Sequence, residues 1–126
     1  MALKTDYRER FGDLDERYFL YYEEVDWALR GGKTAPPVWA RDAIVYHRHG
    51  AVAGSQIKQG ARGGLAEFHM ARSRMLFALK WRPWLVPLIL GVSAIQAGRR
   101  VLRGRMRQAR ALLLGAFGGH WREAVN

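Results

Sequence analysis

The chain has no cysteine among its 126 residues. This absence excludes disulfide bonds and every zinc site built on thiolate ligands. Acidic residues are also few, with 11 Asp and Glu against 21 Lys and Arg, so the formal net charge is +10 at pH 7. Hydrophobic residues make up 49% of the chain, which is enough for a packed core and unlike the composition of a disordered chain. The length allows one domain or part of a larger protein.

Long hydrophobic runs are also lacking. The longest apolar run, residues 84–98, is about fifteen residues long and is interrupted by proline, glycine, serine and glutamine. A membrane-spanning helix needs roughly 20 predominantly apolar residues, so this run predicts a buried or interfacial helix rather than a span. The N-terminal residues MALKTDYRERFG lack the apolar core of a secretory signal peptide, and we expect no export.

Positive charge is concentrated in the second half of the chain. Residues 1–60 contain nine basic and nine acidic residues, whereas residues 61–126 contain twelve basic and two acidic residues, a net charge of +10. This asymmetry predicts that the second half meets an anionic surface, either lipid or nucleic acid. We expect two regions: residues 1–62, with any carboxylate chemistry, and residues 63–126, a basic amphipathic helical region.

The first region is predicted to contain a short helix followed by a loop and a strand. The helix should begin near Tyr22 or Glu23 and end at about Arg30, because the glycines at residues 31 and 32 that follow are a helix stop signal. Two prolines and two glycines indicate a loop over residues 31–41. The β-branched and aromatic residues 43–46 predict a strand.

The second region is predicted to be helical throughout. Apolar residues recur at helical spacing over 65–81, with Arg72 on the apolar stripe. Pro83 suits the first turn of a further helix that runs to about Leu102. Beyond it, the pattern predicts a basic amphipathic helix whose apolar face carries Leu102, Met106, Ala109 and Leu113.

Three acids, Glu23, Glu24 and Asp26, are the strongest candidates for catalysis. Neighbouring carboxylates raise one another's proton affinity, so one of them can act as a general base. The alternative is that they only stabilise the positive end of the helix dipole, which favours anions in the first turn. Two tyrosines directly before them favour a sugar site, because aromatic side chains commonly line such sites.

Histidines and arginines are the remaining candidates. His47 and His49 alternate along the predicted strand end, so they would point to opposite faces and would not readily share a metal. Six arginines between residues 99 and 110 occur without one acid. With two tryptophans before the apolar run they predict an anionic membrane surface ahead of nucleic acid, for which the chain has no recognisable motif. The predicted membrane-surface residues are Arg99, Arg103, Arg107, Arg110, Trp81 and Trp84.

Three segments together resemble the family 2 glycosyltransferases, inverting enzymes of the GT-A fold that include rhamnosyltransferases. The segment LDERYFLYYEEVDWALR is similar to the family's acceptor-side motif, AIVYHRHG to its last core strand, and LAEFHMARSRMLFALKWRP to the helix after the catalytic residues. They occur in the family's order and cover roughly residues 11–83. The resemblance implies a C-terminal portion of an α/β, Rossmann-like GT-A enzyme that is predominantly helical, with one or two short strands.

The resemblance also implies roles for single residues. Glu24 matches the acid that deprotonates the acceptor hydroxyl, although Asp is commoner there, and Glu23 is its neighbour in the motif. Asp26 matches a further acid that helps to shape the acceptor site. His47 and Arg72 match residues near the acceptor or the diphosphate.

The complete enzyme would transfer a sugar from a nucleotide diphosphate donor to a saccharide or lipid-linked acceptor. In the family, a nucleotide-binding half with an Asp-x-Asp motif holds Mg²⁺ or Mn²⁺ on the diphosphate. We expect this donor half to be missing here. The chain by itself should then have no catalytic activity and bind no cation. We also expect a cytoplasmic protein, peripheral on the inner face of the membrane, that self-associates through its unpaired strand edge. The alternative is a non-catalytic membrane-surface or adaptor protein that uses its basic helices.

Overall fold

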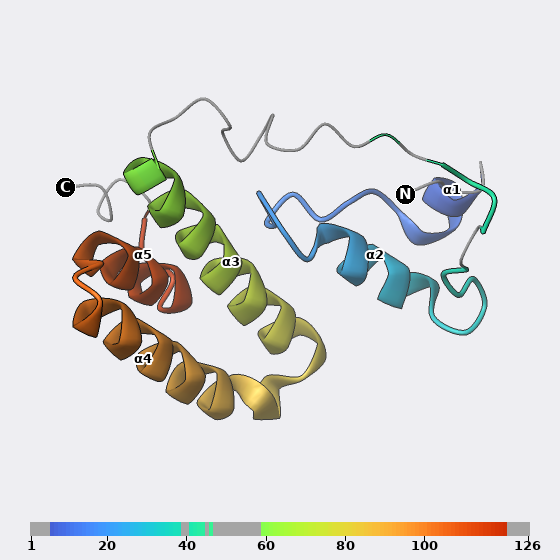
Figure 1. The fold of residues 1–126 in the computed structure, drawn as a ribbon. Helices are drawn as coiled ribbons and strands as arrows, with labels where there is room; N and C mark the ends of the chain where they lie inside the picture. Colours follow the sequence, from blue (N-terminus) through green and yellow to red (C-terminus); the bar gives the residue numbers. More distant parts are fainter. Residues whose placement is uncertain (1–5, 39–40, 45, 47–58, 121–126) are drawn as a thin grey trace.

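The structure is a computed structural model that describes residues 6–38, 41–44, 46 and 59–120, with the backbone alone for residues 59–63. These residues form five α-helices and one short 3-10 helix. The elements in chain order are α1 (Tyr7–Phe11), α2 (Glu23–Gly31), α3 (Gln59–Trp81), the 3-10 helix (Pro83–Leu85), α4 (Val86–Leu102) and α5 (Met106–Ala116). Figure 1 shows α3, α4 and α5 as one helical unit, with α2 between this unit and α1.

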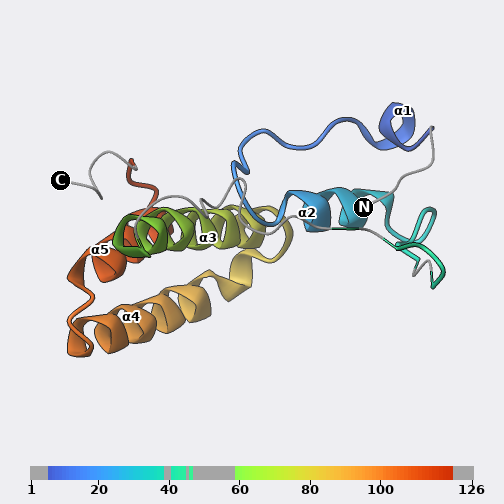
Figure 2. The same ribbon diagram turned by 45° about the horizontal axis from the view of Figure 1, so that its top comes forward.

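The core of the helical unit lies between α3 and α5. Phe68 and Leu112 are each 1% exposed, and small residues of all three helices surround them. A Cβ at Gly115 would strike the backbone carbonyl of Phe68, so only glycine lets α5 approach α3 this closely. On the other side, Arg100 of α4 donates to Glu67 of α3 over 3.0 Å. Figure 2 shows α4 on the side of α3 that faces away from α1.

The N-terminal elements are held together by hydrogen bonds to backbone carbonyls. The Tyr7 hydroxyl donates to the Trp27 carbonyl, and the Trp27 indole N–H donates to the Gly12 carbonyl, each over 2.8 Å. Arg30 donates to the carbonyls of Phe11 and Asp13 over 2.8 and 2.6 Å. The bonds to Gly12 and Asp13 satisfy backbone carbonyls of the segment between α1 and α2, and the bonds to Phe11 and Trp27 join the two helices.

The helices predicted from the sequence are largely confirmed. The helix expected near Tyr22 or Glu23 begins at Glu23, and the helix expected over 65–81 ends at Trp81 but begins earlier, at Gln59. The helix opened by Pro83 ends at Leu102, and its first turn is the 3-10 helix.

The predicted α/β character is not seen in the part of the chain that the structure describes, which is helical. Ala43, Ile44 and Tyr46 lie in no strand, and Ile44 and Tyr46 are 80% and 93% exposed. The strand prediction is therefore wrong for these residues, because a strand is stabilised by a neighbouring strand that accepts its hydrogen bonds and none lies beside them among the described residues. The self-association inferred from its edge loses that basis.

The predicted continuous basic helix is also corrected. The chain turns at residues 103–105, where Gly104 has φ +70°, so Leu102 and Met106 belong to different helices. Leu102 is 88% and Met106 60% exposed, while Ala109 is buried. Of the four predicted residues, Ala109 is buried and Leu113 packs against the core, because α5 folds back onto α3, whereas Leu102 and Met106 stay outside that contact.

Candidate functional site

The acidic segment, residues 14–30, lies along one face of α3, although the two are far apart in sequence. Phe19 stacks on His69 with ring centroids 4.6 Å apart, and Tyr22 stacks on Phe77 at 5.2 Å. Between them, the Ser73 hydroxyl donates to the Leu20 carbonyl over 2.8 Å. The α3 partners follow one another at four-residue intervals, which places them on a single helix face.

Asp26 is the centre of the contact between α2 and the end of α3. Its side chain is fully buried. The Trp81 indole N–H donates to Asp26 Oδ1 over 2.7 Å, and Lys80 Nζ lies 2.8 Å from the same oxygen. Arg30 Nε lies 3.3 Å from Oδ2. The carboxylate is thus neutralised and hydrogen-bonded, as a buried charge must be.

Asp15 extends this cluster towards the surface. It accepts hydrogen bonds from Arg17 over 2.9 and 2.7 Å and from Lys80 over 3.1 Å. These bonds, those of Arg17 first, hold the pKa of Asp15 well below its usual range. Burial, together with the charges of Asp26 and Asp15, raises the pKa of the nearby Tyr18 hydroxyl to about 12.

Glu23 and Glu24 occupy the first turn of α2 in different surroundings. Glu24 is exposed. Glu23 is half-buried, and its Oε2 is enclosed without a hydrogen-bond partner among the described residues. Both lie at the N-terminal end of α2, where the helix dipole is positive. The three carboxylates therefore have different surroundings. Glu24 is open to solvent, Glu23 is enclosed, and Asp26 is ion-paired.

The chain enters α2 through an unusual backbone conformation. Tyr21 and Tyr22 have φ of 70° and 72°, and they are the described non-glycine residues with positive φ. Such a conformation costs of order 1–3 kcal/mol for each residue and is concentrated at functional sites. The bend turns the chain sharply just before the two glutamates, so that Tyr22 packs on α3 while Glu24 faces solvent.

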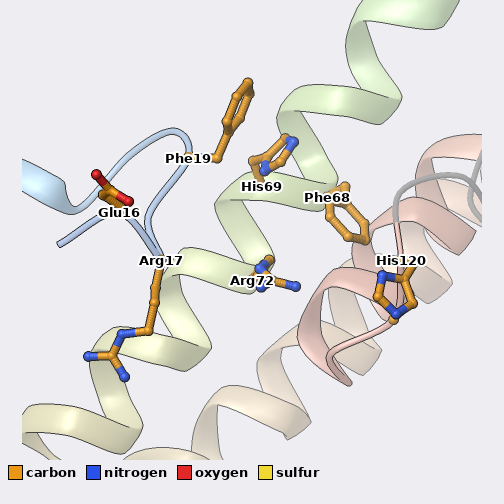
Figure 3. A pocket seen from close by; sticks show the side chains of 8 residues that line it. Glu16, Arg17, Phe19, Phe68, His69, Arg72 and His120 are labelled. Atoms are coloured by element: carbon orange, nitrogen blue, oxygen red, sulfur yellow. The ribbon is translucent and has the colours of Figure 1, made fainter.

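A cavity of about 260 Å³ lies near this face, where the loop before α2 meets α3 and the end of α5. Figure 3 shows His69, Arg72 and His120 around it, while Glu16 and Arg17 point away from these three. Among the described residues, no carboxylate lies within ion-pair distance of Arg72. Burial and the positive charge of Arg72 lower the pKa of His69.

The other predicted site residues lie elsewhere. His47 is outside the described residues. Trp81 belongs to the Asp26 cluster, whereas Trp84 is 65% exposed. The predicted membrane-surface arginines all lie exposed around the end of α4 and along α5, and they are Arg99, Arg103, Arg107 and Arg110.

The described residues do not present a metal site. They contain no group of three histidine or acidic side chains that could hold a metal ion. An Asp-x-Asp spacing does occur at Asp13 and Asp15, but Asp13 pairs with Arg8 and Asp15 with Arg17 and Lys80. These carboxylates therefore do not fit the cation-binding role of the family's motif.

Sequence reasoning missed Lys80 and the partner role of Trp81. The only sequence signal was their position on the α3 face that also carries His69, Ser73 and Phe77. No family model, no curated protein and no solved structure matches this chain.

Proposed function

We propose that this chain supplies the acceptor side of an inverting, family 2-like glycosyltransferase, with Glu24 as the general base. The observation that carries the proposal is the pairing of the acidic segment with α3. These are the first and third of the segments that resemble the family, and they form one unit through Asp26, Lys80 and Trp81. That unit presents Glu24 to solvent at the start of a helix.

Glu24 would accept the proton of an acceptor hydroxyl while that oxygen bonds to the anomeric carbon of the donor sugar. The bond between the anomeric carbon and the diphosphate oxygen breaks, and the nucleotide diphosphate leaves with that electron pair. General base catalysis of this kind contributes roughly 10²- to 10⁴-fold in rate. The exposed Glu24 is open to a saccharide, whereas the fully enclosed Asp26 has no room for one.

The other residues would position the base. Tyr21 and Tyr22 set the bend before α2, and the aromatic side chains beside it offer a surface on which a sugar ring can pack. Asp26 anchors α2 on α3 rather than touching the acceptor. Donor binding is assigned to residues outside this unit.

The test begins with acceptor binding by the whole chain. We expect a panel of neutral oligosaccharides to shift the backbone amide NMR signals of residues 21–24 in the ¹⁵N-labelled protein. Glu9→Gln, a change at another exposed first-turn acid, should leave the shifts unchanged. The absence of any shift in residues 21–24 across the panel would contradict the proposal.

A second experiment tests the base itself. The chain is fused to the nucleotide-binding half of a family 2 rhamnosyltransferase in place of that enzyme's own acceptor side. We expect sugar transfer by the fusion to fall about 10²-fold or more in Glu24→Gln, with oligosaccharide binding retained. Equal transfer by the two fusions would show that Glu24 is not the base.

A further inference from the structure

We propose that α4 docks on an anionic phospholipid surface. The helix lies along that surface, its exposed apolar face enters the bilayer, and the arginines at its C-terminal end bind the lipid phosphates. This inference is independent of the proposed glycosyl transfer. It rests on the faces of α4, on the charges at its C-terminal end and on the absence of acids from residues 83–120.

An apolar stripe on α4 lies open to solvent. Leu88, Ile95 and Leu102 are 63%, 66% and 88% exposed and recur every seven residues, which is one side of a helix. Leu85 and Val92 lie in the same stripe and are also exposed. Contiguous exposed apolar surface of this kind marks an interaction site rather than ordinary protein surface.

The opposite side of α4 packs against the other helices of the protein. Ser93 and Ala97 are buried, and Ala97 packs in the core cluster with Ala71 and Leu112. Arg100 reaches across to Glu67 of α3. The segment Pro83–Leu102 is long and apolar enough to cross a membrane by length and composition, but the side of the helix that carries Ser93 and Ala97 packs against the other helices and is closed to lipid.

Cations surround the C-terminal end of the stripe. A hollow of about 190 Å³ is lined by Arg99, Arg100, Arg103 and Arg105, with Gln96 and Glu67. Glu67 is paired with Arg100, so the remaining guanidinium groups carry uncompensated positive charge. Guanidinium groups match phosphate oxygens in geometry as well as in charge.

A tryptophan marks the other end of α4. Trp84 is 65% exposed, and the Arg82 guanidinium lies 5.4 Å from its ring centroid. An aromatic ring beside a cation is typical of the level of the lipid headgroups. This arrangement of an apolar stripe, a tryptophan and arginines is typical of helices that lie in the membrane interface. Nucleic acid would engage the arginines but not the stripe, and a second copy would place like charges against each other.

The experiment uses the full chain and vesicles of phosphatidylcholine with or without phosphatidylglycerol. We expect co-sedimentation with the anionic vesicles, release by alkaline carbonate, and quenching of tryptophan fluorescence by brominated acyl chains that is reduced in Trp84→Phe. Ile95→Asp should weaken vesicle binding roughly tenfold or more. The double variant with Arg99→Gln and Arg103→Gln should weaken binding to anionic vesicles about thirtyfold. Leu29→Asp, a matched change at an exposed leucine of α2, should bind as the wild type does.

Several results would overturn the proposal. These are no binding to anionic vesicles, unchanged binding by folded Ile95→Asp, or retention after alkaline carbonate, which would indicate a span. Displacement by inorganic phosphate alone would assign the hollow to a soluble anion. A dimer that dissociates in Ile95→Asp without any vesicle binding would assign the stripe to a second copy. Circular dichroism establishes that each variant is folded.

Discussion

At the scale of single residues, burial separates acids that the sequence presents as equals. Glu23, Glu24 and Asp26 occur within four positions, and spacing alone makes each a candidate base or a helix-dipole partner. Asp26 is enclosed by Lys80, Arg30 and Trp81, while Glu24 remains in solvent. Two hydrogen-bond donors, Lys80 and Trp81, and the nearby Arg30 cation hold this buried carboxylate in place, and the contact joins α2 to α3.

Replacing Asp26 tests that role. Asp26→Asn should lower the free energy of unfolding by about 3 kcal/mol, because it leaves the partly buried Arg30 without its counter-charge and Lys80 with Asp15 alone. Urea unfolding measures the change. Glu24→Gln, at an exposed position, should stay within about 0.5 kcal/mol of the wild type; equal losses in the two variants would contradict the assignment.

The backbone at Tyr21 gives a second prediction at this scale. Asparagine tolerates positive φ, whereas a β-branched side chain does not. Tyr21→Val should therefore unfold at a lower urea concentration than Tyr21→Asn, with a difference of about 1 kcal/mol or more in unfolding free energy. If the two variants are equally stable, Tyr21 does not have the left-handed conformation in solution.

At the scale of elements, α3 makes tertiary contacts through two of its faces. One face meets the acidic segment through His69, Ser73 and Phe77. The other, with Phe68 and Ala71, packs on α5 and α4. This double contact explains why the apolar residues of 65–81 predict the helix correctly but do not say what covers each side of it.

Two glycines test the packing of these helices. Gly115→Ala should destabilise the protein by about 1–3 kcal/mol, because the new methyl group meets the Phe68 carbonyl. Gly98→Ala is the matched control: no atom lies within 4 Å of its Cβ position, so the better helix propensity of alanine should stabilise α4 by about 0.5–1 kcal/mol. Thermal unfolding of both variants shows whether each substitution lowers or raises the stability of the protein. Two stabilised variants would show that α5 does not approach α3 so closely.

At the scale of the whole molecule, titratable groups link the N-terminal segment to the helical unit. The pKa of His69 is lowered by burial and by Arg72, and that of Asp15 is lowered by Arg17 and Lys80. Each depressed pKa means that the unfolded chain binds more protons, so its contribution to stability is present at higher pH and is lost on acidification. The His69 contribution is lost below about pH 6.5, and that of Asp15 below about pH 4.

We therefore expect the urea midpoint to fall as the pH is lowered from about 7.5 to 5. In His69→Gln the fall over this range should be smaller, because no imidazole titrates beside Arg72. A midpoint that rises over the same range in the wild type would contradict the partly buried placement of His69 beside Arg72.

The sequence by itself determined the helical character, the start of α2, the end of α3 and the concentration of positive charge in the second half. These features follow from local patterns: apolar residues at helical spacing, glycine and proline as stop and start signals, and the identity of the charged residues. The predicted strand over 43–46 failed for its described residues because β-propensity is realised only beside a partner strand.

Only the tertiary structure decided which acid is buried and which faces of the helices stay open. Lys80 and Asp26 are 54 positions apart, and nothing in local spacing links them. The turn at Gly104 likewise exposes Leu102 and buries Ala109, although both fit one helical stripe. Burial and pairing depend on contacts between distant segments, and these form only when α2, α4 and α5 pack around α3.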